Sequence, residues 1–207
     1  MLFRSQVKYP QGDEKQLIKS INGREVPSGG LPLDIGCIVS NTGTLHAIYE
    51  AVVLEKPLID RVVTVSGGAV AKPANLKVRI GTPVGDLIEE CGGFSQIPAK
   101  IVTGGPMMGQ TIYDLDTPVT KGTSGILALT EREVHLAPRT ACIQCGRCVD
   151  ACPIGLQPTR LFKLVDHFEH DQAVAEGLMD CRECGCCGYI CPARIPLVQG
   201  MRVGKQM

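Results

Sequence analysis

Cysteine is the feature that most constrains this chain. Eleven of its 207 residues are cysteines, and nine of these lie between Cys142 and Cys191. Eight of the nine follow one spacing twice: three cysteines at intervals of three residues, a fourth after four more, and then proline. The first copy runs from Cys142 to Pro153 and the second from Cys181 to Pro192. This repetition is the strongest signal in the sequence.

The spacing is typical of ligands to iron-sulfur clusters. A compact loop with Gly146 or Gly185 can wrap around one corner of a cubane, so that three thiolates reach three irons of one cluster. In two-cluster ferredoxins the fourth cysteine reaches the other cluster. The sequence therefore predicts two 4Fe-4S clusters with crossed ligation. Cys142, Cys145, Cys148 and Cys191 would hold the first, and Cys181, Cys184, Cys187 and Cys152 the second.

Zinc and disulfides fit the cysteines less well. A four-cysteine zinc site needs neither a third cysteine three residues on nor a trailing Cys-Pro in both copies. Disulfides fit worse, because three cysteines within seven residues cannot all find sensible partners in a reducing compartment. Cys186 is out of register and is interpreted as a packed residue or a donor near a cluster. Cys37 and Cys91 are expected to be buried structural thiols.

Composition excludes several function classes. Lysine plus arginine and aspartate plus glutamate both total 21, and tryptophan is absent, so nucleic acid binding is not expected. The N-terminal residues include no apolar region of signal-peptide length, which favours a reducing compartment. No apolar run approaches the roughly 18 residues that a membrane span needs, so any membrane association is expected through partners. Arg147 and Arg182 lie inside the two loops. Their positive charge would raise the reduction potential of a bound cluster, or they are ordinary solvated arginines at the surface.

The pattern along the chain predicts an α+β protein. Helices are expected at 15–21, from 45 to about 55, after the N-cap Thr82, from Pro158 onward and at 173–178. A buried strand is expected at 35–39, and β-branched runs predict strands at 62–66, 76–80, 100–103 and 126–129. After Pro138 strand signals are few, and a helical ferredoxin-type module fits the long insertion between Cys152 and Cys181.

Several further runs resemble the RnfC family, the C-type subunits of the Rnf complex, which is an ion-translocating ferredoxin:NAD oxidoreductase. They are Lys8 to Gly12, Glu14 to Ile18, Gly23 to Pro32, Gly104 to Gly109, Pro118 to Thr123 and the paired cysteine motifs. The resemblance extends through the whole chain. It implies the end of an FMN and NADH-binding domain at 1–60, a β-grasp domain of the soluble-ligand-binding (SLBB) type at 61–130, and a helical two-cluster domain at 131–207.

The resemblance also implies site residues. Gly12, Glu14, Asn41 and Thr44 match positions that line the FMN site in such proteins. The turn from Asn41 to Thr44, expected between a strand and a helix, would suit a phosphate, although an ordinary capped turn has the same pattern. The chain starts close to the Tyr-Pro-Gln-Gly run, whereas family members carry a glycine-rich stretch upstream of it. We therefore expect an N-terminally truncated chain that alone lacks a complete NADH and FMN site.

The implied function is electron relay in a peripheral subunit at the cytoplasmic face of a bacterial plasma membrane. The implied partners are the other Rnf subunits and, in the intact protein, NAD(H). A soluble corrin reductase with the same flavin, β-grasp and cluster layout is the alternative within redox enzymology. A zinc-stabilised assembly module without redox function is the alternative from another class.

Overall fold

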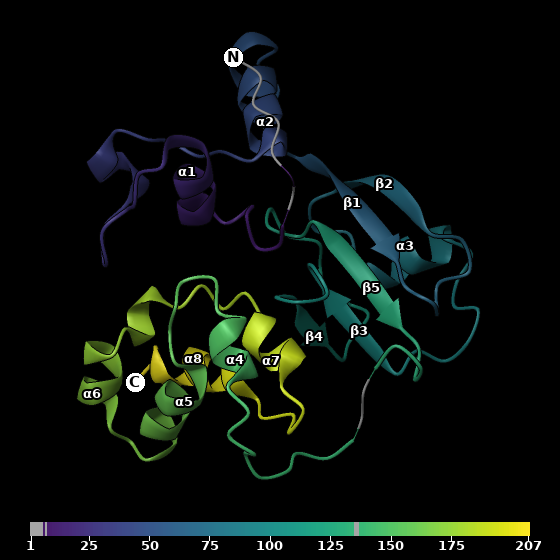
Figure 1. The fold of residues 1–207 in the computed structure, drawn as a ribbon. Helices are drawn as coiled ribbons and strands as arrows, with labels where there is room; N and C mark the ends of the chain where they lie inside the picture. The colour runs from purple at the N-terminus through teal and green to yellow at the C-terminus, as the bar shows by residue number, and fades with distance from the viewer. Residues whose placement is uncertain (1–5, 7, 135–136) are drawn as a thin grey trace. The chain divides into compact units, whose positions relative to one another are not determined.

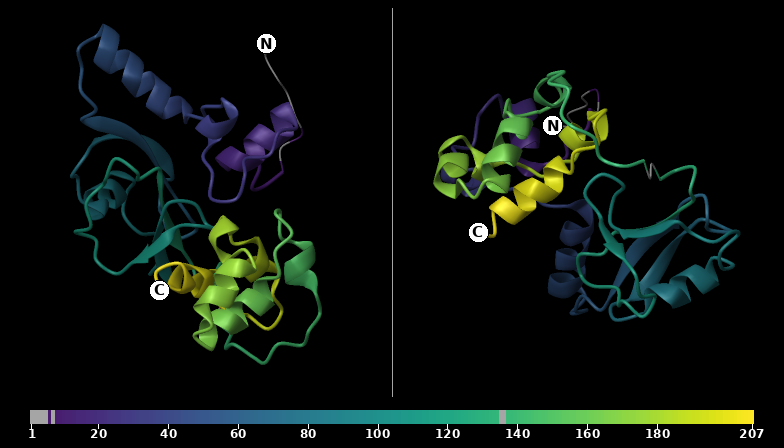
Figure 2. Two further views of the ribbon diagram at one scale, coloured as in Figure 1. Left: turned by 90° about the vertical axis from the view of Figure 1, so that its left-hand side faces the viewer. Right: turned by 90° about the horizontal axis from the view of Figure 1, so that it is seen from below.

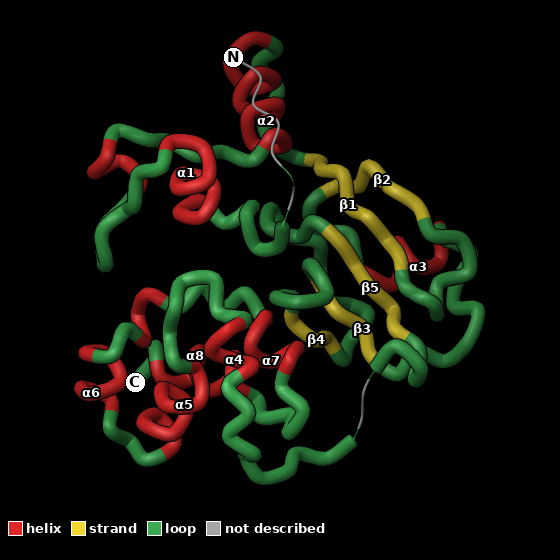
Figure 3. The backbone as a smooth tube through the Cα atoms, in the orientation of Figure 1, coloured by secondary structure: helices red, strands yellow, loops and turns green. Residues whose placement is uncertain are grey.

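A computed structural model describes residues 6, 8–134 and 137–207 of the chain. These residues form two compact units, one of residues 42–138 and the other of residues 1–41 together with 139–207. Figure 1 and Figure 3 show strands in the first of these units and helices joined by long loops in the second. Units defined by contacts are not the same as domains along the chain, so the boundaries at 60 and 130 stay a prediction.

The unit of residues 42–138 is built on one mixed sheet of five strands in the order β2-β1-β5-β3-β4. β1 pairs antiparallel with β2 and parallel with β5, while β3 pairs antiparallel with both β4 and β5. The elements are α2 (Thr42–Val53), β1 (Asp60–Ser66), β2 (Ala74–Arg79), α3 (Val84–Glu90), β3 (Lys100–Thr103), β4 (Gln110–Ile112) and β5 (Gly125–Leu129). A hairpin, a helix and a last strand parallel to the first make the expected β-grasp arrangement.

Buried and exposed residues alternate along the two central strands, and the buried ones form the core on one face of the sheet. Val63 and Val65 of β1 are fully buried, as are Ile126 and Ala128 of β5, and Val65 lies opposite Ile126 in the register. Side chains at a period of two share one face of a sheet. The apolar residues of α3, among them Leu87, pack onto this face. The helix therefore covers one side of the sheet and closes the core.

The regular elements of the other unit are short helices and 3-10 turns joined by loops. They are α1 (Glu14–Asn22), η1 (Pro32–Ile35), α4 (Arg147–Asp150), α5 (Pro158–Asp166), α6 (His170–Ala175), η2 (Leu178–Asp180), α7 (Cys186–Ile190) and α8 (Leu197–Gly204). Leu161 of α5 and Leu197 and Met201 of α8 are almost fully buried in one core. Partly buried cysteines, including Cys181 and Cys187, pack against that core. Figure 2 shows these helices in two further directions. The cysteines therefore sit on a rigid apolar base.

Most expected elements are present with small shifts at their ends. In α1, Asp13 is the N-cap and accepts hydrogen bonds from the backbone N–H groups of Lys15 and Gln16. The helix ends at Gly23, which has φ +69°. The expected helix at 173–178 is displaced: α6 ends at Ala175 and a separate turn, η2, follows. The short strand β4 was missed because three residues carry no readable alternation.

Two expected local structures were wrong. The buried strand at 35–39 is absent: Pro32–Ile35 form a 3-10 turn, which the Asp34 carboxylate stabilises by accepting from the Leu31 N–H at 2.7 Å. Thr82 is not the N-cap of α3, since its hydroxyl donates to the Arg79 carbonyl at 2.9 Å and Pro83 holds the cap position. In both places a short polar side chain satisfies nearby backbone groups in a turn. No described helix is long and apolar enough to cross a membrane.

Candidate metal centre

The two cysteine motifs adopt the same backbone conformation. Gln144 and Glu183, each one residue before the second cysteine of its motif, have φ values of 54° and 53°. Gly146 and Gly185, each one residue after that cysteine, have φ values of 75° and 87° and begin the short helices α4 and α7. Left-handed φ is uncommon for residues other than glycine. Each motif therefore curls into a tight loop.

Backbone amides donate to sulfur in both loops. The N–H of Gln144 lies 3.4 Å from Sγ of Cys142, and the N–H of Glu183 lies 3.4 Å from Sγ of Cys181. After the first motif, the N–H of Leu156 lies 3.3 Å from Sγ of Cys152. Hydrogen bonds to sulfur stabilise its charged form and tune the potential of a bound cluster. Each motif thus provides cysteine sulfurs that already accept hydrogen bonds from backbone amides.

Four cysteines from the two motifs line a first cavity of about 380 Å³. Three of them come from the first motif, Cys142, Cys145 and Cys148, and the fourth is Cys191 at the end of the second motif. Thr159 and Lys163 of α5 complete part of the wall. The fold therefore brings together sulfurs that are up to 49 positions apart in sequence, from Cys142 to Cys191.

The other four cysteines line a second, much tighter cavity of about 20 Å³. Cys181, Cys184 and Cys187 come from the second motif and Cys152 from the end of the first. Much of the remaining wall is apolar and includes Leu161. Each cavity thus contains three cysteines of one motif and the last cysteine of the other.

The donor set in each cavity suits an iron-sulfur cluster. Four thiolates are the ligands that a 4Fe-4S cluster takes. Among the described residues, no group of three or more histidine, cysteine, aspartate or glutamate side chains is arranged to hold a single metal ion. The cysteine sulfurs line cavities instead of meeting at a point. The first cavity, of about 380 Å³, has room for a multinuclear group, whereas the second, of about 20 Å³, would have to widen to take one.

Burial keeps some of these thiols protonated in the absence of metal. Burial, and after it the charge of Cys181, raises the pKa of Cys187 to about 12. Burial also raises the pKa of Cys181, against the opposing influences of the Glu183 amide and then of Lys205. For Cys186, burial and then the neighbouring Cys184 raise the pKa to about 11. Binding of metal to the second loop must therefore displace protons, which makes assembly pH-dependent.

Charged residues of α8 hold the second loop. Lys205 donates from Nζ to the Cys181 carbonyl at 2.6 Å and to the Glu183 carboxylate at 3.0 Å. Arg202 donates from Nε to the other oxygen of Glu183 at 3.0 Å. The opposite charges of these side chains lower the pKa of Glu183 although its burial opposes this. The loop is therefore fixed to the helix that carries the core residues Leu197 and Met201.

The N-terminal segment also contacts the second loop. The Tyr9 hydroxyl donates to the carbonyl of Cys184, 175 positions away. Asp13, the N-cap of α1, lies 3.8 Å from Arg182. Ser28 donates to the carboxylate of Asp180 at 2.8 Å. Sequence reasoning missed these contacts, because their partners are far apart in the chain and belong to ordinary surface residue types.

The residues expected at an FMN site lie on the surface. Gly12 and Glu14 are exposed at the start of α1, Asn41 is exposed before α2, and Thr44 is exposed in the first turn of α2. Thr44 belongs to the unit of residues 42–138 and the other three to the second unit. The strand expected before Asn41 is absent, so the turn there does not link a strand to a helix. The assignment stays a prediction.

Cys37 and Cys91 differ in burial, although both were expected to be buried. Cys91 is buried, with 2% of its surface exposed, and burial raises the pKa of its thiol. Cys37 is only half-buried, and Asn22 donates to its sulfur at 3.4 Å. The expectation of a buried structural thiol therefore describes Cys91 and was wrong for Cys37.

Three family models match successive parts of the chain. A Nuo51 FMN-binding domain matches residues 1–50, an SLBB domain matches residues 62–111, and a 4Fe-4S dicluster domain matches residues 141–195. The dicluster match includes all eight cysteines of the two motifs, and the SLBB match falls on β1 to β4 and α3. The cluster type and the order of the parts agree with what the sequence predicts.

Curated relatives resemble the chain over most of its length. The C-type subunit of the Na(+)-translocating ferredoxin:NAD(+) oxidoreductase complex of Acetobacterium woodii is 47% identical over 99% of this chain and 46% of its own length. Its counterpart in the ion-translocating oxidoreductase complex of Rhodobacter capsulatus is 50% identical over 95% of this chain and 38% of its own length. The chain belongs to the RnfC family. The counterpart in the proton-translocating ferredoxin:NAD(+) oxidoreductase complex of Clostridium ljungdahlii is 55% identical over 74% of this chain and 34% of its own length.

Membership of the RnfC family favours the Rnf interpretation over the corrin reductase and the zinc module. The chain spans less than half the length of these curated relatives. The activity of the full-length relatives is therefore a proposal for this chain.

Proposed function

We propose that the chain is the electron-relay part of an RnfC protein, with two 4Fe-4S clusters held by cysteines of both motifs. Cys142, Cys145, Cys148 and Cys191 would hold one cluster, and Cys181, Cys184, Cys187 and Cys152 the other. When bound, each cluster supplies a site that accepts or releases one electron. The observation that supports this most is the pair of cavities, each lined by four cysteines from both motifs.

The residues around the cysteines have distinct functions in this proposal. The amides of Gln144 and Glu183 donate to sulfur and favour its charged form. Lys205 and Arg202 hold the second loop through Glu183, so the sulfurs of that loop keep their positions as charge changes. The crossed arrangement ties the end of each motif to the start of the other. The two cysteine motifs would thereby be joined to each other at the cluster sites.

The names of the relatives indicate a function within a larger complex. The chain would take part in a ferredoxin:NAD oxidoreductase that translocates ions, peripheral to a bacterial plasma membrane on the cytoplasmic face, together with the other proteins of the complex. FMN would bind near Gly12, Glu14, Asn41 and Thr44, which the match to the Nuo51 FMN-binding domain includes. NAD(H) would be the partner of the intact protein.

Metal and sulfide analysis of anaerobically purified chain tests the proposal. We expect about eight iron and eight labile sulfide per chain. One or two equivalents of zinc with negligible iron would instead support a zinc module and refute electron relay. Absorption in the visible region that dithionite bleaches provides an independent check.

Single cysteine substitutions test the crossed ligation. Cys152→Ser and Cys184→Ser should remove the same signal from the electron paramagnetic resonance spectrum of the reduced chain. Cys191→Ser and Cys145→Ser should remove the other signal. Cys186→Ser is the control, because Cys186 is outside the two sets, and it should leave both signals. Loss of the same signal in Cys152→Ser and Cys145→Ser would show uncrossed ligation.

A further inference from the structure

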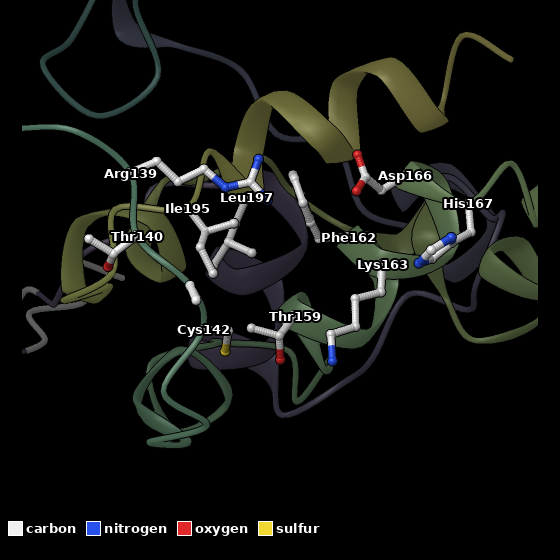
Figure 4. A pocket seen from close by; sticks show the side chains of 11 residues that line it. Arg139, Thr140, Cys142, Thr159, Phe162, Lys163, Asp166, His167, Ile195 and Leu197 are labelled. Atoms are coloured by element: carbon white, nitrogen blue, oxygen red, sulfur yellow. The ribbon is translucent and has the colours of Figure 1, made fainter.

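A larger cavity lies beside the first cysteine motif. Its volume is about 540 Å³, and Cys142, Thr159 and Lys163 line both it and the cavity that contains the first four cysteines. Figure 4 shows Lys163 extending toward Thr159, while Arg139 enters from the segment that precedes Cys142. A group bound in this cavity would therefore lie next to a sulfur of the first set.

The cavity combines an apolar floor with a mainly basic rim. Phe162 and Leu197 are buried in its floor. The Arg139 guanidinium lies over the Phe162 ring, 5.2 Å from its centre, and Lys163 is exposed at the rim. His167 and one carboxylate, Asp166, complete the charged and titratable groups of the lining. The ion pairs found among the described residues involve neither Arg139 nor Lys163.

The surface near the first motif is also open and partly apolar. Ile143, between the first two cysteines, has 67% of its surface exposed, and Cys145 is exposed. Arg147 is exposed in the same loop. Ile143 lines the first cysteine cavity together with Arg160 and Lys163. An exposed apolar residue near basic side chains resembles the centre and rim of a protein interface more than a pocket for a small ion.

The second motif has the opposite character. Arg182 within this motif pairs with Asp13, and Arg202 and Lys205 at the α8 end pair with Glu183 of the motif. The N-terminal segment contacts the loop through Tyr9. The N-terminal segment and α8 therefore pair with charges at the second loop. Beside the first loop, Arg160 pairs with Glu176, whereas Arg139 and Lys163 take part in none of the ion pairs found among the described residues.

We propose that the face formed by the first motif and this cavity docks an acidic redox protein or domain. Carboxylates of the partner would meet Arg139 and Lys163, and an apolar part of it would cover Ile143. The inference rests on the proposed function, since docking beside Cys142 and Cys145 matters only if a cluster is bound there. One electron leaves the donor and reaches the acceptor across this face, so no bond forms and no proton is transferred.

Binding of a strongly acidic bacterial ferredoxin to the full, iron-loaded chain tests the proposal. The dissociation constant is measured by calorimetry at low ionic strength, and the electron-transfer rate constant by stopped-flow absorption. The double charge reversal Arg139→Glu with Lys163→Glu should weaken binding and slow transfer at least tenfold, and high salt should remove most of that difference. Lys163→Glu alone, an exposed change on α5, should give a smaller effect in the same direction.

A matched control separates this face from net charge. Lys72→Glu with Lys121→Glu makes the same charge change at two exposed positions of the unit of residues 42–138. This control should leave binding nearly unchanged. Equal weakening by both double variants, or absence of ferredoxin binding to the unaltered chain, would overturn the inference. Iron content and the two resonance signals are measured first: a chain without clusters defeats the proposed function as well, whereas two normal clusters with no effect of Arg139 and Lys163 defeat only the docking face.

Discussion

A glycine at the contact between α5 and α8 offers a quantitative test of the helical unit. Gly200 lies in α8 and faces Phe162 of α5, which is 8% exposed. A Cβ atom at Gly200 would overlap Cδ2 of Phe162 and stand 2.7 Å from Cε2. Carbon atoms in contact prefer separations of about 3.5–4.0 Å. The Gly200→Ala variant must therefore move the ring or separate the helices.

The expected change in the free energy of unfolding has two opposing parts. Extra methyl groups forced into a well-packed core cost about 1–3 kcal/mol. Alanine favours a helix over glycine by up to about 1 kcal/mol. Gly200→Ala should therefore be destabilising by up to about 2 kcal/mol net. For a chain of this size, each kcal/mol lowers the melting temperature by about 2–4 °C.

A control with the same chemical change isolates the steric part. Gly85 lies in α3, and a Cβ atom there would meet Leu115 Cβ at 3.4 Å, an ordinary contact. Gly85→Ala should be neutral or stabilising. Because helix propensity acts in the same direction in both variants, their difference of about 1–3 kcal/mol measures the clash with Phe162.

The assay is anaerobic thermal and denaturant unfolding, followed by circular dichroism and by cluster absorbance. The double variant Gly200→Ala with Phe162→Leu should be more stable than the sum of the two single changes predicts, because the smaller side chain makes room for the methyl group. If Gly200→Ala stabilised the chain as much as Gly85→Ala, the close approach of α5 and α8 would be wrong.

Three other changes test separate parts of the structure. Leu161→Ala, in the core that supports the cysteines, should lower the free energy of unfolding by about 2–5 kcal/mol, measured by denaturant unfolding. Lys205→Met removes the donor to the Cys181 carbonyl and should alter the resonance signal of the second set alone, while Lys205→Arg should restore part of it. Hydrogen bonds from backbone and hydroxyl donors lower the pKa of Glu133, so its contribution to stability is present above its ordinary pKa of 4.5 and is lost as the pH falls below it. Glu133→Gln should therefore make unfolding less sensitive to acid, as a pH series of melting temperatures would show.

Local features of the chain were predictable because neighbouring residues determine them. The N-terminal acidic residues of α1, the proline that begins α5 and the β-branched run in β1 act over a few positions, and each element lies where it was expected. The expected strand at 35–39 failed for the same kind of reason. Pro32 and Asp34 favour a tight turn there, and their local hydrogen bonding prevails over an apolar run.

The amino-acid sequence alone shows two cysteine motifs with the same spacing of three, three and four positions, which is typical of loops that bind an iron-sulfur cluster. The surroundings of each loop depend on the tertiary fold. Tyr9, Asp13 and Lys205 meet the second motif through long-range folding, whereas Arg139 and Lys163 are left at the open rim beside the first. Two motifs with identical cysteine spacing thus receive different charge and exposure, because these depend on which distant side chains pack against each loop and not on the spacing itself.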